Sequence, residues 1–295
     1  MRTAVWQKSE RQSYNMKEAK MVSHVDASLH LLKHALAFTL WPDPLVPVKP
    51  SALAPGHFWR RAAVHLLAKV AHAAGYRLAR SPGCSDADRA EGKVWREYSD
   101  TMIGLRRLEN IQACVEIVLA NKVPGDLIET GAWRGGACIF MRGILAAHGI
   151  TDRRVFVADS FEGLPPPDEE KYPADSGDQH HTLDFLAVDL ETVKENFRRY
   201  GLLDDQVVFL KGWFSETLPS APIERLAVLR LDGDMYGSTM DALQALYPKL
   251  SPGGFCIVDD YALEGCRRAI DDFRASHAIS SPLQTIDWTG RFWQK

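Results

Sequence analysis

The sequence has no long hydrophobic run. Nowhere do about eighteen apolar residues follow one another, the length that a helix needs to cross a bilayer. Residues 1–20 are polar and charged, without the apolar segment of a secretion signal. We therefore expect a protein that neither spans a membrane nor is exported, and we expect it in the cytoplasm.

Cysteine and excess charge are also scarce. The five cysteines form no Cys-x-x-Cys pair and stand mostly in apolar or helical settings, so we expect reduced thiols and no disulfide. The net charge is only -3, and lysine and arginine are scattered, so we expect no nucleic-acid partner. A chain of 295 residues that is 46% hydrophobic can bury one large core, which favours a soluble enzyme.

Two nucleotide-binding motifs are missing. Gly131, Gly135 and Gly136 form a glycine-rich turn that matches neither G-x-G-x-x-G nor a phosphate-binding P-loop. Glu129 stands just before this turn, where its carboxylate would repel phosphate. It suits a cationic amino-acid ligand, such as the ammonium and sulfonium portion of S-adenosylmethionine. A turn of this kind also commonly joins a strand to a helix without binding a ligand. Both interpretations, a cofactor-binding turn and a simple connection, therefore stay open.

Strand-like and helix-like segments alternate from residue 102 onward, which predicts an α/β fold with a parallel sheet. We expect helices over residues 103–119, 138–146, 190–200 and 239–247, strands over residues 126–129, 155–158, 207–210, 226–231 and 255–258, and a turn at residues 251–254. Asp159 ends the second strand, at the distance where a doubly wound nucleotide fold places an acid on ribose hydroxyls.

The first hundred residues do not show this alternation of strands and helices. Helices are expected over residues 27–40 and 57–78, separated by five prolines that indicate an extended, lid-like segment or a linker. Residues 81–91 are expected to form a polar loop. We treat residues 1–100 as an N-terminal helical or lid extension and residues 101–295 as the α/β domain.

Four aspartates end two of the predicted strands. Asp232 and Asp234 follow one apolar run, and Asp259 and Asp260 follow another. The carboxyl ends of parallel strands are where α/β folds place ligands, and converging carboxylates favour Mg²⁺ or Mn²⁺ over zinc. The alternative is that these acids are separate helix caps and solvated turn residues.

Five segments, in order, resemble the macrocin O-methyltransferase family. They are residues 129–137 (Glu-Thr-Gly-Ala-Trp-Arg-Gly-Gly-Ala), 159–167 (Asp-Ser-Phe-Glu-Gly-Leu-Pro-Pro-Pro), 211–214 (Lys-Gly-Trp-Phe), 231–236 (Leu-Asp-Gly-Asp-Met-Tyr) and 258–261 (Val-Asp-Asp-Tyr). The resemblance spans roughly residues 95–295, whereas residues 1–25 and 51–91 match no pattern that we can place. It implies a class I methyltransferase fold with a Rossmann-like, mostly parallel sheet over residues 101–295. It also implies methylation of sugar hydroxyls on macrolide, aminocoumarin and related antibiotics, with S-adenosylmethionine and Mg²⁺.

The resemblance also assigns roles to the four aspartates. Asp232, Asp259 and Asp260 match the metal ligands, and Asp234 is then the base that takes the proton of the acceptor hydroxyl. A sugar hydroxyl has a high pKa, so its methylation calls for both a cation and a base. An alternative makes Asp232 both ligand and base, with Asp234 as a ligand.

Cofactor contacts follow from the same match. The expected cofactor residues are Thr101, Met102, Glu129, Thr130, Gly131, Ala132, Trp133, Asp159, Ser160, Phe161, Glu162, Gly163, Gly212 and Trp213. Asp159 is expected on the ribose, and Gly212 with Trp213 at the adenine edge. An equally weighted alternative is that Trp213 packs in the hydrophobic core.

The candidate residues for contact with the acceptor lie in loops and near the end of the sequence. His180 and His181 lie in a polar loop that is placed to cover the site, where one of them contacts the acceptor; solvated surface is the alternative. The aromatic residues Trp288, Phe292 and Trp293 either stack on the acceptor or pack in the core or at a dimer contact. We expect a small glycosylated acceptor, and the family resemblance implies at least a dimer.

Two other functions stay open. A metal-dependent methyltransferase of the catechol or caffeoyl type has the same fold and a similar acidic triad but acts on a phenolic diol. A non-catalytic scaffold that binds S-adenosylmethionine is the second alternative.

Overall fold

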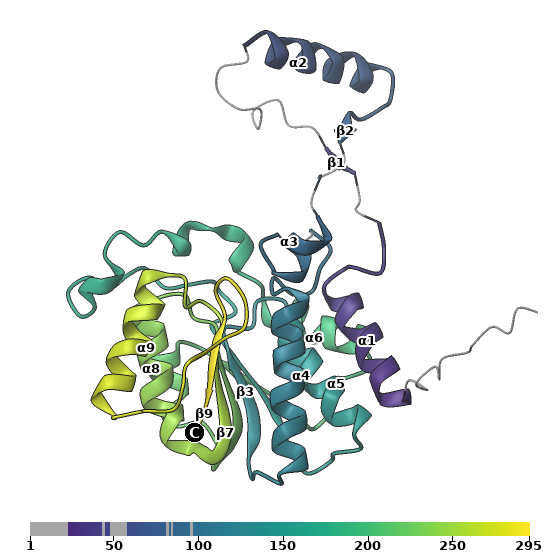
Figure 1. Cartoon of the computed structure of the whole chain (residues 1–295). Coiled ribbons are helices and arrows are strands. Elements are labelled where there is room, and N and C mark those ends of the chain that lie inside the picture. The colour runs from purple at the N-terminus through teal and green to yellow at the C-terminus, as the bar shows by residue number, and fades with distance from the viewer. Residues whose placement is uncertain (1–22, 43–44, 48–57, 81–82, 84, 95–96) are drawn as a thin grey trace, which may run out of the picture.

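A seven-stranded sheet forms the centre of the molecule. The computed structural model describes residues 23–42, 45–47, 58–80, 83, 85–94 and 97–295 (Figure 1). The strand order is β5-β4-β3-β6-β7-β9-β8. These strands are β3 (Asp126–Thr130), β4 (Val155–Asp159), β5 (Val207–Lys211), β6 (Leu226–Leu231), β7 (Leu250–Val258), β8 (Gln284–Thr285) and β9 (Arg291–Gln294).

The order of the strands in the sheet indicates where a ligand would bind. Strands β3 to β7 pair with one another in parallel, and β9 runs antiparallel to β7 and β8. The chain moves outward from β3 through β4 to β5 and then returns to the other side of β3 with β6. The strand order therefore reverses between β3 and β6, and ligands of doubly wound folds bind at the carboxyl ends of strands at such a point. The predicted doubly wound, mostly parallel α/β sheet is confirmed.

Helices cover both faces of the sheet. One face carries α4 (Leu105–Ala120), α5 (Gly136–Ala147) and α6 (Leu190–Arg199), whose apolar side chains join one buried cluster. The other face carries the short helix α7 (Phe214–Thr217) with α8 (Tyr236–Leu246) and α9 (Glu264–Ser276), which join a second cluster (Figure 1). The sheet therefore separates two hydrophobic cores.

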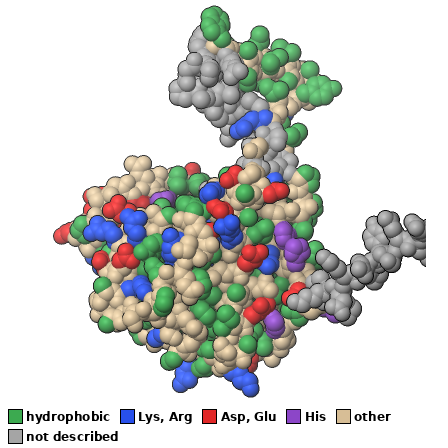
Figure 2. Space-filling model, viewed as in Figure 1, with side chains coloured by type: hydrophobic (Ala, Val, Ile, Leu, Met, Phe, Trp, Pro, Cys, Tyr) green, Lys and Arg blue, Asp and Glu red, His purple; other side chains and the backbone are tan. Residues whose placement is uncertain are grey.

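The N-terminal part divides into two pieces. Helix α1 (His24–Leu36) buries Leu29 and Leu36, and Leu32 packs onto Gly143 of α5. Helix α2 (Phe58–Ala73) stands away from the body, joined through the paired strands β1 (Val46–Pro47) and β2 (Ala79–Arg80) (Figure 1). Figure 2 shows hydrophobic side chains gathered over this projecting piece, and Trp59 of α2 is 83% exposed.

The structure corrects two expectations. The predicted polar loop at residues 81–91 contains a short helix, α3 (Asp86–Ala90), because the Ser85 side chain accepts a hydrogen bond from the N–H of Asp88 and caps it. The predicted turn at residues 251–254 lies inside β7, because Gly253 and Gly254 exchange backbone hydrogen bonds with Lys295. Helix α9 and strand β8 were not predicted.

Other expectations concern what the chain lacks. The cysteines in the described part of the chain are all free and buried, and Cys84 lies outside that part. Within the described ranges, no helix is long and apolar enough to cross a membrane. Residues 1–22 and most of the predicted proline-rich segment also lie outside the described residues.

Candidate active site

Three aspartates converge at the carboxyl ends of β6 and β7. Asp232, Asp259 and Asp260 each offer a carboxylate oxygen, and these oxygens lie within 4.8 Å of one another. Asp234 lies beside them, where its backbone N–H donates to Asp260 Oδ2 over 3.2 Å. The backbone of Asp234 has φ +57°, a conformation that few residues other than glycine adopt. The acids are therefore brought together, as one cluster and not as separate caps.

Two buried arginines hold this cluster, and both were missed in the sequence. Arg230 donates to Glu129, to Asp232 over 2.7 Å and to Asp259. Arg107, on α4, donates to the other oxygen of Asp259 and, through Nε, to Asp287 over 2.9 Å. The available signal was a charged residue inside the apolar run of β6, because arginine is almost never fully buried without partners.

Burial shifts Asp232, Asp234 and Asp260 toward their neutral forms. It raises the pKa of Asp234 to about 7, with the charge of Asp232 adding to the shift and His180 opposing it. It raises the pKa of Asp260 well above its usual range, with Asp234 as the next cause. The pKa of Asp232 is also raised, by burial and then by Asp259. A cation among these oxygens would favour their charged forms, and an all-oxygen donor set fits a hard divalent ion such as Mg²⁺.

The glycine turn after β3 packs closely against the residue that follows β6 and lines the first cavity. Gly131 has φ +90°, and a Cβ there would lie 1.7 Å from the backbone oxygen of Asp232, so only glycine fits. The Asp159 carboxylate accepts backbone N–H bonds from Ala132 (2.7 Å), Trp133 (3.3 Å) and Phe161 (2.7 Å). Asp159 thus fixes the turn, and its contact with a ribose stays a prediction.

Two cavities meet over the acids. One, of about 320 Å³, contains most of the expected groove: Met102, Gly131, Trp133, Asp159, Ser160, Gly163, Gly212 and Trp213 all line it. The other, of about 300 Å³, is lined by Thr101, Glu129, Ala132, His180, Asp259 and Asp260, among others. Five residues line both cavities: Met102, Trp133, Leu186, Asp232 and Asp234. A group passed from one cavity to the other would cross beside Asp234.

Three of the expected cofactor residues do not line either cavity. Thr130 is buried, and its hydroxyl lies 3.5 Å from the backbone oxygen of Arg230. Phe161 is buried against Phe209, and Glu162 is exposed, where it pairs with Lys211 at 3.5 Å. These three residues support the groove from behind or lie outside it.

One of the two predicted histidines faces the site. His180 lines the second cavity, and its Nδ1 lies 2.6 Å from Asp178 Oδ2. His181 is exposed and lines neither cavity. The loop that carries them is tied down by Asp175, which was missed in the sequence. Its carboxylate accepts the N–H groups of Tyr236 (2.6 Å) and Gly237 (2.8 Å) at the start of α8.

The three C-terminal aromatic residues have different positions. Trp293 is fully buried and packs on Tyr247 in the second core, and Phe292 packs on Phe255. Trp288 lines the second cavity, where its indole N–H donates to the backbone oxygen of Glu91 over 2.9 Å. Of the three, Trp288 alone lines one of the two cavities.

Comparison with known proteins yields close relatives. The chain is 58% identical over 214 residues to 8-demethyl-8-(2,3-dimethoxy-alpha-L-rhamnosyl)-tetracenomycin-C 4'-O-methyltransferase from Streptomyces olivaceus, covering 72% of this chain and 82% of the relative. It is 56% identical over 209 residues to demethyldecarbamoylnovobiocin O-methyltransferase from Streptomyces niveus, covering 70% and 80%. The solved structure of the O-methyltransferase NovP superimposes with a TM-score of 0.77 at 45% identity, covering 92% of this chain and 99% of that one.

The family comparison extends beyond the motifs found in the sequence. The model of the macrocin-O-methyltransferase (TylF) family matches residues 25–295, so the match includes α1 and the projecting α2, well before the predicted start near residue 95. The sheet, with its reversal between β3 and β6, is that of class I, S-adenosylmethionine-dependent methyltransferases. The chain is an O-methyltransferase and belongs to the macrocin-O-methyltransferase family.

Proposed function

We propose that this enzyme moves a methyl group from S-adenosylmethionine to a sugar hydroxyl of a glycosylated natural product, with Mg²⁺ held by Asp232, Asp259 and Asp260. The observation that carries the proposal is the meeting of the two cavities at Asp232 and Asp234. A methyl donor in the first cavity and an acceptor in the second would face each other there. Proximity and alignment of the reacting atoms supply a large part of such catalysis.

The chain's own residues divide the work. The cation, when bound, stabilises the negative charge that develops on the acceptor oxygen. Asp234 takes the proton of the hydroxyl as the new C–O bond forms and the C–S bond of the donor breaks. Asp260 Oδ2 accepts the backbone N–H of Asp234, so the proposed base lies beside the proposed metal ligands. In the alternative assignment, Asp232 is both ligand and base.

Residues of both cavities support an orientation of the cofactor. Glu129 and Thr101 line the second cavity and Met102 lines both, so we place the methionine end of the cofactor at the junction of the cavities, where Glu129 suits its ammonium group. Gly212 and Trp213, which follow β5, line the first cavity, and we assign the adenine to them. We keep Asp159 as the ribose residue, because it lines the same cavity.

The relatives favour a sugar acceptor over a phenol. The Streptomyces olivaceus relative is named for a rhamnosyl group that it methylates at the 4' position. The second cavity offers polar groups for a sugar, with His180 among them, and the flat face of Trp288 for an attached ring. We propose the same acceptor class here.

The oligomeric state, the cellular location and the domain boundaries are also proposals. We infer a cytoplasmic homo-oligomer of at least two copies, with residues 1–100 as an extension of the methyltransferase domain at residues 101–295. The exposed apolar side chains of α2 support a contact with another copy, because soluble monomers rarely expose large apolar patches. Sedimentation of the full chain should give a mass of at least twice 33.0 kDa, and a monomer would contradict the proposal.

A methyl-transfer screen tests the function. Radiolabelled S-adenosylmethionine is offered with glycosylated polyketides and aminocoumarins, with their aglycones, and with catechols, each with Mg²⁺ or with a chelator. We expect label on the glycosylated acceptors alone, and only with Mg²⁺. Label on the catechols would support the phenolic alternative, and cofactor binding without any metal-dependent transfer would support the scaffold.

A further inference from the structure

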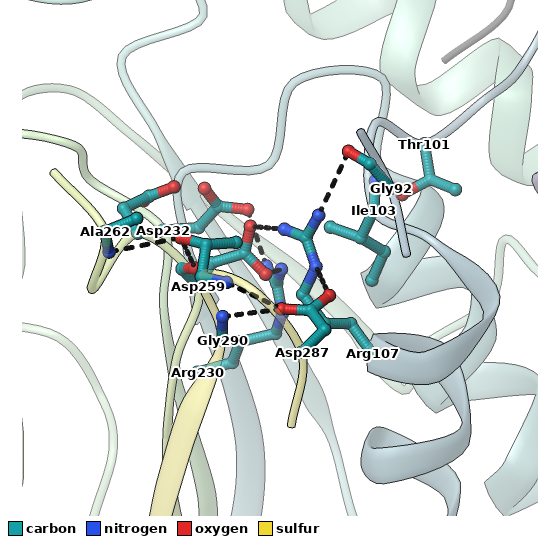
Figure 3. Close-up of polar contacts among 12 residues, drawn as sticks. Gly92, Thr101, Ile103, Arg107, Arg230, Asp232, Asp259, Ala262, Asp287 and Gly290 are labelled. Atoms are coloured by element: carbon teal, nitrogen blue, oxygen red, sulfur yellow. Dashed lines mark hydrogen bonds and ion pairs between the residues drawn. The ribbon is translucent and has the colours of Figure 1, made fainter. Parts of the chain in front are cut away.

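Arg230 contacts three carboxylates that come from three neighbouring strands. Its guanidinium donates to Glu129 at the end of β3, to Asp232 after β6 and to Asp259 after β7. The side chain is 1% exposed, so bulk solvent hardly reaches its N–H groups. Figure 3 shows Arg230 beneath the site, with Asp232 and Asp259 above it and Arg107 to the side.

These three acids serve two different ligands in the proposed function. Glu129 lines the second cavity near its junction with the first, where we assign it to the ammonium group of the cofactor, whereas Asp232 and Asp259 belong to the cation set. A single nitrogen, Nη1, donates to both Glu129 and Asp232, and Nη2 donates to Asp259. The same planar group therefore fixes the side-chain oxygens of both sites.

Arg107 provides a contrast within the same network. It also binds Asp259, but its other side-chain partners are Asp287 and the backbone oxygen of Gly92. No hydrogen bond or ion pair recorded for the described residues joins Arg107 to Glu129. Arg107 thus supports the cation side of the cluster alone.

We propose that Arg230 is a positioning residue shared by the cofactor site and the cation site. The proposal rests on the proposed function, because it takes Glu129 as a cofactor contact and Asp232 and Asp259 as metal ligands. Arginine is suited to this task because its guanidinium presents several N–H donors in one rigid plane. Lysine at this position would keep the charge but could not hold three carboxylates in the same geometry.

Two binding measurements on the full chain, without acceptor, test the proposal. Calorimetry gives the affinity for S-adenosylhomocysteine, and electron paramagnetic resonance gives the affinity for Mn²⁺. In Arg230→Lys, we expect Mn²⁺ to bind about 10- to 100-fold more weakly, as when supporting partners of metal ligands are removed. We expect S-adenosylhomocysteine to bind about tenfold more weakly, as when a charged hydrogen bond is lost.

Two matched variants make the result specific. Arg107→Lys should weaken Mn²⁺ binding and leave S-adenosylhomocysteine binding as in the wild type. Arg142→Lys should change neither affinity, because Arg142 is a buried arginine whose partner, Asp204, belongs to neither site. Thermal unfolding of each variant, and of Arg230→Met as a second replacement, checks that the protein is folded.

The outcomes separate this inference from the proposed function. If Arg230→Lys loses Mn²⁺ affinity alone, or neither affinity, Arg230 is not shared and the inference is wrong. Unfolding of both Arg230 variants while Arg142→Lys stays folded would also overturn it, because Arg230 would then serve folding first. A wild-type chain that binds neither ligand would instead contradict the proposed function.

Discussion

At the scale of single residues, the site depends on environments that the sequence does not display. In the sequence, Asp234 was one of the four aspartates that follow two predicted strands, and the fold distinguishes it by a left-handed backbone and a pKa raised to about 7. Arg230 lies inside an apolar run, and its partners come from other strands. Residue types and strand ends could therefore be predicted, whereas the arginine network could not, because it joins residues distant in sequence.

The raised pKa of Asp234 predicts a pH dependence. A base works in its ionised form, so kcat/KM should rise with pH as Asp234 loses its proton. Burial sets the midpoint near 7 without a cation, and a bound cation lowers the pKa and moves this acidic limb to lower pH. The pH profile of methyl transfer checks this. A profile that falls with rising pH between pH 5 and about 7 would contradict the assignment.

Gly131 cannot gain a side chain without a clash against the backbone. Gly131→Ala would place a Cβ 1.7 Å from the backbone oxygen of Asp232 at a positive φ, which forces β3 and β6 apart. We expect a loss of more than about 1 kcal/mol in the free energy of unfolding, together with weaker S-adenosylhomocysteine binding. Urea unfolding and calorimetry measure both. Gly149→Ala is the control, because it has a positive φ but no neighbour within 4 Å.

At the scale of elements, local patterns predicted the central strands and helices well and the connections poorly. Strand β6 was predicted with its observed bounds, because a buried parallel strand is a continuous apolar run. The turn predicted at residues 251–254 is part of β7, since its pairing partner is the distant C-terminal residue Lys295. Glycine and proline indicate a local preference for a turn. Pairing with a strand that is distant in sequence overrides this preference.

The loop that carries His180 is an element whose position depends on Asp175. Asp175→Ala removes the acceptor for two N–H groups at the start of α8. We expect it to lower the free energy of unfolding by about 0.5–2 kcal/mol, the effect of losing a helix cap. We also expect a raised KM for the acceptor, because His180 of this loop lines the second cavity, where we place the acceptor. Asp168→Ala, in the same loop, serves as a control; equal effects on KM from both variants would contradict this role.

At the scale of the whole molecule, the reversal of strand order between β3 and β6 explains why distant motifs form one site. The glycine turn follows β3, and the aspartates follow β6 and β7, so all of them lie at one edge of the sheet. This much could be predicted, because the carboxyl ends of parallel strands share an edge. The path of α2 could not, since its apolar face predicts burial and the structure leaves that face exposed.

The central claim is that the base is distinct from the metal ligands, and Asp234→Asn tests it most directly. The measurement pairs the kcat of methyl transfer with Mn²⁺ affinity in the same preparation, with Asp260→Asn as the ligand control. We predict a fall in kcat of about 10²- to 10⁴-fold in Asp234→Asn with Mn²⁺ affinity unchanged, whereas Asp260→Asn loses Mn²⁺ affinity. Loss of Mn²⁺ binding in Asp234→Asn, or turnover near the wild-type rate, would contradict the account.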